Sequence, residues 1–395
     1  MKKTIISIAA LVVLFILFFV STSYMNSINE KFFNYVSKNT LYYQVEDVNY
    51  TKGLLNSQGN FIIKLNDLPY EFKVNAIFSN VFFAGNNVKI SIINQNDDFK
   101  DIFSNEEIGN INAKFNPFNI NSNINLKLKI NNVNYSNEQI GSIKWNDIYI
   151  ALNTKEGLVK DIIYNIGDFS VIDVIPNETK IEIKNAHVVE IPVTALKFED
   201  IFNPTRNSEQ NISIEYANFT DEAVFDNLHI YAKTIPNTQN DYNNDLKLTL
   251  NKLHLIQEDL LLNNINLDAN FNNISKKAYE QLMFSPNIDI FFMMAIANEF
   301  LKANPQIILD NLSFEKEGKK FNANAQAIFT QNNIKSQLHI NTQILPSQFW
   351  PTFEYFDSYF VDENGTYVLD FIYDDSDKND IKTIINGEGI TLNPQ

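Results

Sequence analysis

Two neighbouring stretches, Leu248-Thr-Leu-Asn-Lys-Leu-His-Leu255 and Leu260-Leu-Leu-Asn-Asn-Ile-Asn-Leu267, share one pattern of eight residues. The pattern, named the octad here, reads apolar-x-apolar-x-x-apolar-x-apolar, with polar residues at its fourth and fifth places. The chain holds ten copies, and nine of them carry Asn or Asp at the fifth place. Their uneven spacing argues against a solenoid of fixed period. The copies cover residues 43–50, 63–70, 76–83, 128–135, 143–150, 181–188, 223–230, 248–255, 260–267 and 307–314.

The octad predicts strands that bend. Successive side chains of a strand point to opposite faces, so strict alternation would separate the first and third residues from the sixth and eighth. A β-bulge at the fourth and fifth places restores the phase, because two residues then oppose one on the partner strand. Asn and Asp suit such a site because they tolerate the left-handed conformation, although a tight turn is the alternative. We therefore expect a mainly β fold with a few helices, built on a large, curved, bulged antiparallel sheet.

Composition excludes several classes of protein. The 395 residues suffice for two or three domains or one large β domain, and 45% of them are hydrophobic. The 31 Lys and Arg against 47 Asp and Glu give a net charge of -16, which argues against binding of nucleic acid. The absence of cysteine from the sequence excludes disulfides, zinc ribbons and thiol catalysis.

The N-terminus predicts a membrane anchor. Two lysines precede an uncharged run from Thr4 to Val20, close to the roughly 17–25 residues that span a bilayer. Basic residues stay on the cytoplasmic side, so the chain after residue 20 is expected across the membrane. A cleaved signal peptide is the alternative, but its apolar core usually has only about 7–15 residues. The apolar side chains expected to hold the anchor include Ile5, Leu11, Leu14, Phe18 and Val20.

Several segments show helical signals. Met25, Ile28, Phe32 and Val36 recur at helical spacing, which predicts an amphipathic stalk over residues 21–40 that packs onto the protein's own body. Asn273 is expected to cap a helix over residues 274–284. A further helix is expected between Asn287 and Pro305, and its apolar run at 290–297, too short to span a membrane, is expected to be buried.

An aromatic segment follows Pro351, which fits the first turn of a helix. We expect this helix to plug the sheet, whereas contact with a lipid interface is the alternative. The aromatic residues are Phe349, Trp350, Phe353, Tyr355, Phe356, Tyr359 and Phe360.

Catalytic patterns are absent from the sequence: it holds no G-x-S-x-G, H-E-x-x-H, Walker or Rossmann glycine motif. Glu354 and Asp357 lie one helical turn apart and can do acid–base work, but a solvated helix face is favoured. Asp375 begins a partial match to a calcium loop, for which an acidic hairpin turn is the favoured interpretation. The histidines at 187, 229, 254 and 339 occupy solvent-facing strand positions, so we expect no catalytic, cofactor-binding or metal-binding residue.

Two stretches resemble a bacterial family. Tyr50-Thr-Lys-Gly-Leu-Leu-Asn-Ser57 resembles the Y-x-R-G-W-F-x-S signature of the YdgA-like proteins (domain of unknown function 945), with Lys52 at the arginine position. Asn304-Pro-Gln-Ile-Ile-Leu-Asp-Asn-Leu-Ser-Phe-Glu-Lys-Glu-Gly318 resembles their later helix–Pro–strand–Gly segment. This resemblance implies an exported, inner-membrane-anchored protein with no established enzyme activity. The octad strands are also similar to those of AsmA-like groove proteins, which implies the handling of lipids in the envelope.

We therefore expect a single-pass protein of the bacterial inner membrane, with an anchor at 1–20, a stalk at 21–40 and a periplasmic β-rich domain at 41–395. The domain can consist of two halves that meet near residues 190–210. The expected function is that of a non-enzymatic envelope scaffold or a handler of lipids or other hydrophobic ligands. An envelope hydrolase and a protein-partner adaptor are the alternatives. Whether helices fill the apolar interior or leave an open groove stays undecided. Residues expected to line it are Phe78, Ile130, Trp145, Phe225 and Leu262.

Overall fold

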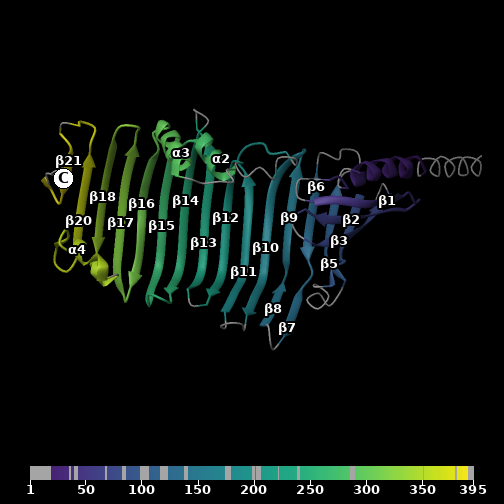
Figure 1. Cartoon of the computed structure of the whole chain (residues 1–395), viewed down its shortest axis with the longest axis horizontal. Coiled ribbons are helices and arrows are strands. Elements are labelled where there is room, and N and C mark those ends of the chain that lie inside the picture. The colour runs from purple at the N-terminus through teal and green to yellow at the C-terminus, as the bar shows by residue number, and fades with distance from the viewer. Residues whose placement is uncertain are drawn as a thin grey trace, which may run out of the picture. The chain divides into compact units, whose positions relative to one another are not determined.

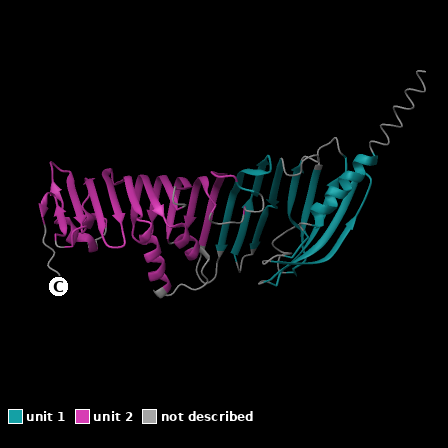
Figure 2. Ribbon diagram, turned by 90° about the horizontal axis from the view of Figure 1, so that it is seen from above, with its two compact units in different colours: residues 1–178, 196–199 teal, residues 179–195, 200–395 magenta. Residues whose placement is uncertain are grey.

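The computed structural model describes residues 19–34, 37–39, 43–66, 69–81, 86–97, 106–115, 123–137, 141–173, 179–197, 201, 206–220, 222–237, 241–284, 290–349, 351–378 and 380–389. Within these ranges the protein is mainly β, as expected, and its paired strands run antiparallel (Figure 1). The chain forms two compact units (Figure 2). Unit 1 comprises residues 1–178 and 196–199, and unit 2 comprises residues 179–195 and 200–395.

Unit 1 is a meander in which each strand pairs with the next. From β6 onward the strands are interrupted: β6 and β7 follow one another along the partner formed by β8 and β9, and β10 pairs with both β8 and β9. The break between β6 and β7 falls at the fourth and fifth places of one octad, and the break between β8 and β9 falls at the fifth place of another. The strands are β1 (Tyr43–Thr51), β2 (Asn56–Leu65), β3 (Glu71–Ser79), β4 (Asn86–Asn94), β5 (Glu107–Phe115), β6 (Ile124–Ile130), β7 (Val133–Asn137), β8 (Gly141–Asn146), β9 (Ile148–Lys155) and β10 (Leu158–Asp173).

A helix over residues 19–34 covers the apolar face of this sheet. Met25 and Phe33 are fully buried, and the Phe33 ring meets the ring of Phe78 edge-on, with 6.1 Å between the centroids. The expected packing of this segment onto the protein's own body is therefore confirmed for the described part of the helix. Residues 1–18, with Ile5, Leu11, Leu14 and Phe18, lie outside the described residues. Val20 is 61% exposed.

No helix in the part of the chain that the structure describes combines the length and the apolar composition needed to cross a bilayer.

Buried amides fix the same helix. The Asn29 side chain donates to Asn80 Oδ1 at 2.8 Å, and the Asn80 amide donates to the Gly53 carbonyl at 2.7 Å. Asn26 also donates to the Gly53 carbonyl, at 3.0 Å, and accepts a hydrogen bond from the Ser57 hydroxyl. Gly53 is required here, because a Cβ would lie 2.0 Å from the carbonyl oxygen of Asn56. The stretch 50–57, which carries the family resemblance, thus forms the seat of the helix.

Unit 2 is also a meander, interrupted by helices between β15 and β16. Each strand from β11 to β18 pairs with the next, and β20 then pairs with β18, β19 and β21. Its strands are β11 (Thr179–Pro192), β12 (Ser208–Phe219), β13 (Ala223–Pro236), β14 (Tyr242–Leu255), β15 (Leu260–Ile274), β16 (Gln306–Lys316), β17 (Lys319–Phe329), β18 (Ile334–Thr342), β19 (Val361–Asp362), β20 (Tyr367–Asp374), β21 (Lys382–Ile385) and β22 (Glu388–Gly389). Its helical segments are α2 (Lys276–Phe284), α3 (Ile290–Lys302), α4 (Glu354–Asp357) and the 3-10 turns η4 (Pro346–Gln348) and η5 (Pro351–Phe353).

The expected cap of the first of these helices was wrong. The Ser275 hydroxyl accepts a hydrogen bond from the Ala278 N–H at 3.2 Å, so Ser275 caps α2. Asn273 still belongs to β15 and adopts a left-handed φ of 56°. The turn from strand to helix therefore uses two polar residues, one to redirect the backbone and one to satisfy the first turn of the helix.

The left-handed residues predicted at the fifth place are present in five octads, at Asp47, Asp147, Asn185, Asn227 and Asn264, with φ between 47° and 53°. The copies at 63–70 and 76–83 instead extend past the ends of β2 at Leu65 and of β3 at Ser79.

The predicted bulge holds at only some sites. Asp47 and Val48 together oppose Phe61, and Asp310 and Asn311 oppose Asn324. From β11 to β15, by contrast, one residue on each strand is left out of the pairing, so both strands of a pair lose the same number of residues and the register does not shift there. Here the bulge prediction was wrong, because breaks on neighbouring strands coincide and no extra residue is needed.

Candidate functional site

Five octads in β11–β15 lie side by side in one register. The first residue of each pairs with the eighth of its neighbour, and the third pairs with the sixth, so apolar residues meet apolar residues across every strand. Leu248 opposes Ile230 on one side and Leu267 on the other. The β12 member, Ile212-Ser-Ile-Glu-Tyr-Ala-Asn-Phe219, escaped the sequence analysis because Glu215 and Tyr216 occupy its central places. Its apolar spacing was the available signal.

In β15 a left-handed residue, Asn264, places all four apolar residues of the octad on one face. Asn263, at the fourth place, pairs with Glu315, so these two side chains leave the sheet on the same side. Asn264, at the fifth place, donates its amide to Glu315 Oε2 at 3.1 Å and therefore leaves on that side too. Leu262 and Ile265 flank this pair, so both point to the opposite face. The phase is restored here by the backbone conformation of one residue, without the predicted bulge in the pairing with β14.

The resulting apolar surface, named the octad face, is covered little. Of its twenty side chains four are buried, fifteen are half-buried and Ile181 is 40% exposed. A sheet packed beneath a second layer would bury such a set almost completely. The members are Ile181, Ile183, Ala186, Val188, Ile212, Ile214, Ala217, Phe219, Ala223, Phe225, Leu228, Ile230, Leu248, Leu250, Leu253, Leu255, Leu260, Leu262, Ile265 and Leu267.

A cavity of about 320 Å³ continues this face toward α2. Its floor is formed by the two rows of cross-strand partners that come after Ile212 and Ile230 on the same face. The first row holds Gln210, Ala232 and Leu246, and the second holds Thr234, Asn244 and Phe271. Tyr279 of α2 forms a wall, and its ring meets that of Tyr242 edge-on, with 6.0 Å between the centroids. This cavity is named the α2 pocket. Its lining includes Arg206, Ser208, Gln210, Ala232, Thr234, Tyr242, Asn244, Leu246, Phe271 and Tyr279.

A buried ion pair lies at the edge of the α2 pocket. Glu190 pairs with Gln210 across the strands and is only 2% exposed. Arg206 holds both of its carboxylate oxygens, with Nε 2.5 Å from Oε1 and Nη2 2.6 Å from Oε2. Sequence reasoning missed this pair, although Arg206 is the only arginine of the chain. The two-pronged geometry is the arrangement in which arginine binds carboxylates most strongly.

The structure distributes the five predicted lining residues between the two units. Phe78 is fully buried under the helix of residues 19–34 in unit 1. Ile130 and Trp145 are half-buried in unit 1, and the Trp145 indole donates to the Asn131 carbonyl at 2.9 Å. Phe225 and Leu262 are half-buried members of the octad face. A ligand-lining role for these residues stays a prediction.

The acid–base pair considered in the sequence does not converge on a site. Asp357 accepts a hydrogen bond from the Ser347 N–H at 3.0 Å and another from the Ser347 hydroxyl, so it braces the turn of residues 346–348. Glu354 is exposed. Among the described residues no group of three or more His, Asp or Glu is arranged to hold a metal ion.

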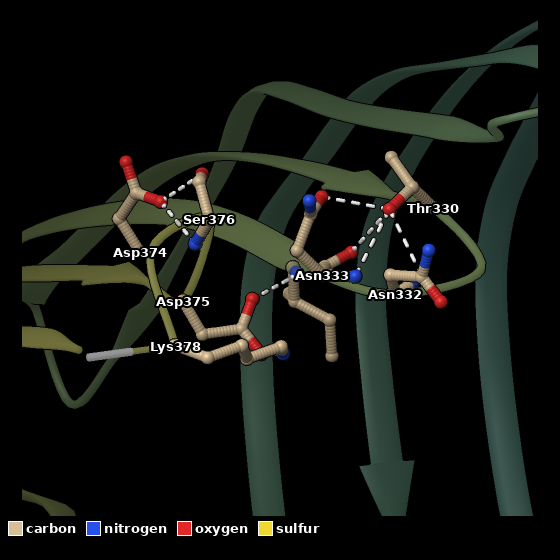
Figure 3. A network of polar contacts seen from close by, with 8 residues as sticks. Thr330, Asn332, Asn333, Asp374, Asp375, Ser376 and Lys378 are labelled. Atoms are coloured by element: carbon tan, nitrogen blue, oxygen red, sulfur yellow. Dashed lines mark hydrogen bonds and ion pairs between the residues drawn. The ribbon is translucent and has the colours of Figure 1, made fainter. Parts of the chain in front are cut away.

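The acidic turn after β20 is held by contacts within the turn and with the start of β18 (Figure 3). Asp375 accepts from the Ile334 N–H at 2.5 Å and pairs with Lys378 at 2.7 Å. Hydrogen bonds from the Ser376 hydroxyl and N–H, aided by Lys335, lower the pKa of Asp374 to about 2. Asn379 lies outside the described residues. These carboxylates serve the turn, as the favoured interpretation predicted.

Two expectations of burial were wrong. Met293 and Met294 of α3 are 46% and 60% exposed, although the helix packs against α2. The aromatic segment meets the sheet at Phe349, whose ring packs against Phe314 and Phe321. Its helix does not plug the sheet, however, since Phe353, Tyr355 and Phe356 are 41%, 70% and 50% exposed. The helix there, α4, has four residues, too few to reach across a sheet. Trp350 lies outside the described residues.

Comparisons with family models, curated proteins and solved structures find no match to this chain. The geometry of the octad face and of the α2 pocket therefore carries the functional argument.

Proposed function

We propose that this chain is a non-enzymatic protein of the bacterial envelope that binds a lipid or another hydrophobic ligand on the octad face. The observation that carries the proposal is the half-burial of fifteen of the twenty side chains of this face. An apolar surface of this extent is unfavourable in water, at roughly 25 cal/mol for each Å² left exposed. A bound apolar molecule would remove that cost.

The membrane setting belongs to the same proposal. Residues 1–20 form the inner-membrane anchor, and the two units lie in the periplasm, where lipids in transit need shelter from water. The resemblance of residues 50–57 to the YdgA-like family and of the octad strands to AsmA-like proteins supports this placement. The hydrolase alternative has less support, because Asp357 is engaged by Ser347 and Glu354 is exposed on the same short helix.

The test uses the full chain held in an amphipathic polymer instead of detergent. Native mass spectrometry with lipid extraction should find an apolar molecule at near-stoichiometric amounts, and the uncharged dye N-phenyl-1-naphthylamine should bind and fluoresce. Phe225→Asp should leave the circular dichroism spectrum unchanged and abolish both signals, because it places a charge on the octad face.

The matched control is Val224→Asp, because Val224 is the neighbour of Phe225 in β13 and its side chain lies on the opposite face of the sheet. It should bind the dye as the unaltered chain does. A ligand-free mass together with no dye binding would overturn the proposal and favour the adaptor alternative.

A further inference from the structure

The octad face changes from apolar to polar along its strands. On β12 the residues that follow one another on this face toward α2 are Ile212, Gln210 and Ser208. Ala232 and Thr234 follow Ile230 on β13 in the same direction. Polar side chains thus gather at one end of the apolar surface, in the α2 pocket, which suits a ligand with one polar end.

The apolar part is long enough for one acyl chain. Residues 212 to 219 of β12 are seven steps apart, which at about 3.3 Å a step gives roughly 23 Å. One leaflet of a bilayer contributes about half of the ~30 Å hydrocarbon core. A chain of ordinary membrane length therefore fits along the strands with its polar end at Gln210.

The charged side chains that line the α2 pocket are Arg206, which is paired with Glu190, and Lys233 and Asp245, which lie on the other face of the sheet. The positive charge of Arg206 is neutralised by Glu190, with which it shares two hydrogen bonds. Lys233 and Asp245 face each other across β13 and β14 and border the pocket from the other face of the sheet, where Lys233 Nζ lies 3.7 Å from Glu209. On the octad face the remaining polar groups that line the pocket are hydroxyls and amides, so a charged head group would lose its hydration without gaining an opposite charge.

A further cation near this lining, Lys276, is also close to an opposite charge. Lys276, at the start of α2, has its Nζ 6.0 Å from the centre of the Tyr242 ring and pairs with Glu280 at 3.9 Å. The pocket is also small, since about 320 Å³ lies near the lower end of the range for ligand sites. A glycerol-sized group is compatible with that volume.

We propose that the α2 pocket binds the uncharged, hydroxyl-bearing head group of an acylglycerol, whose acyl chain lies along the octad face. The inference rests on the proposed function and adds to it the class of lipid and the direction in which it lies. Ser208, Gln210, Thr234 and Asn244 supply the hydrogen bonds to the head group. Arg206 and Glu190 close the polar end.

Three probes with one tail test the head group. Monooleoylglycerol, oleate and oleylamine differ only in an uncharged, an anionic or a cationic head, and each displaces N-phenyl-1-naphthylamine from the full chain in the polymer. Monooleoylglycerol should displace the dye at a concentration about tenfold lower than either charged probe, which is the effect of one or two well-placed hydrogen bonds. Gln210→Leu should remove this preference, so that the three probes displace the dye at similar concentrations.

The matched control is Asn211→Leu, because Asn211 is exposed on the opposite face. It should retain the preference for monooleoylglycerol. If Gln210→Leu does not fold, Asn244→Leu takes its place. Equal displacement by the three probes, or tighter binding of oleate, would overturn the head-group inference while dye binding upheld the proposed function. Failure of the dye itself to bind would overturn both.

Discussion

The two units treat the same kind of surface in different ways. In unit 1 the apolar face of β1–β5 is closed by the helix of residues 19–34, and Phe78 is fully buried beneath it. In unit 2 the octad face of β11–β15 lacks such a cover among the described residues, and Phe225 stays half-buried. Octads occur in both units. Burial is therefore decided by the element that lies on the sheet, rather than by the pattern within the strands.

The hydrogen bonds between the helix of residues 19–34 and the residues beneath it explain why the apolar face of unit 1 is covered. The helix brings Asn26 and Asn29 to amides and carbonyls that its own sheet offers, so the contact is specific as well as apolar. In unit 2 the helix α2 covers only the end of the face, where Tyr279 meets Tyr242. We infer that the open part is kept free for a ligand, whereas the closed part is ordinary core.

The largest expected effect separates Phe78 from Phe225. Phe78→Asp removes a fully buried ring, a loss of about 3–5 kcal/mol, and adds an unpaired carboxylate to the core. It should unfold unit 1. Phe225→Asp should cost unit 2 less than about 2 kcal/mol, because water already reaches its side chain. Hydrogen exchange measured by mass spectrometry resolves the two units peptide by peptide.

Phe78→Leu is the control for the first change, since it keeps an apolar side chain and should leave exchange in β3 slow. Loss of protection throughout β11–β15 in Phe225→Asp would contradict the comparison. It would mean that the octad face is solid core despite its partial exposure.

The ion pair of unit 2 gives the next largest effect. Arg206→Met leaves the Glu190 carboxylate buried without its partner, which should destabilise unit 2 by about 3–5 kcal/mol at pH 7. Glu190→Met together with Arg206→Met should recover most of that loss, because no uncompensated charge then remains. Urea unfolding followed by circular dichroism measures both. If Arg206→Met lowered the free energy of unfolding by less than the double variant does, the ion pair would not stabilise the polar end of the octad face.

The sequence predicted the strands, the helices and the left-handed residues, because each follows from contacts a few residues apart. Asn227, for example, has a left-handed φ, a conformation that an asparagine tolerates because its short polar side chain can bond to the nearby backbone. The sequence could not predict that the unpaired residues of the five strands β11–β15 lie opposite one another, since this depends on the register of pairing across the sheet. The pairing of Arg206 with Glu190 likewise joins residues whose proximity the fold alone creates.

The same limit explains the errors. The apolar run of α3 and the aromatic segment at 349–360 were expected to be buried because apolar side chains usually are. Met294 and Tyr355 are exposed, since the sheet of unit 2 offers no second layer for them among the described residues. A pattern of residues states which side chains favour burial, but whether a partner surface exists is a property of the whole fold.

The smallest expected effect concerns the aligned breaks that give the octad face its single-sided character. Asn227 has a left-handed φ of 53°, which costs an alanine roughly 1–2 kcal/mol and a glycine almost nothing. Asn227→Ala should therefore destabilise unit 2 by about 1 kcal/mol and weaken dye binding, while Asn227→Gly should do neither.

The matched control is Asn251→Ala. Asn251 lies opposite Asn227, where the pairing of β13 with β14 skips one residue on each strand, and it is not among the described residues with a left-handed φ. Asp147→Ala makes the same change in unit 1, where φ is 47°, and should cost as much without altering dye binding. Equal effects of Asn227→Ala and Asn227→Gly would show that the side chain, and not the backbone it permits, keeps the octad on one face.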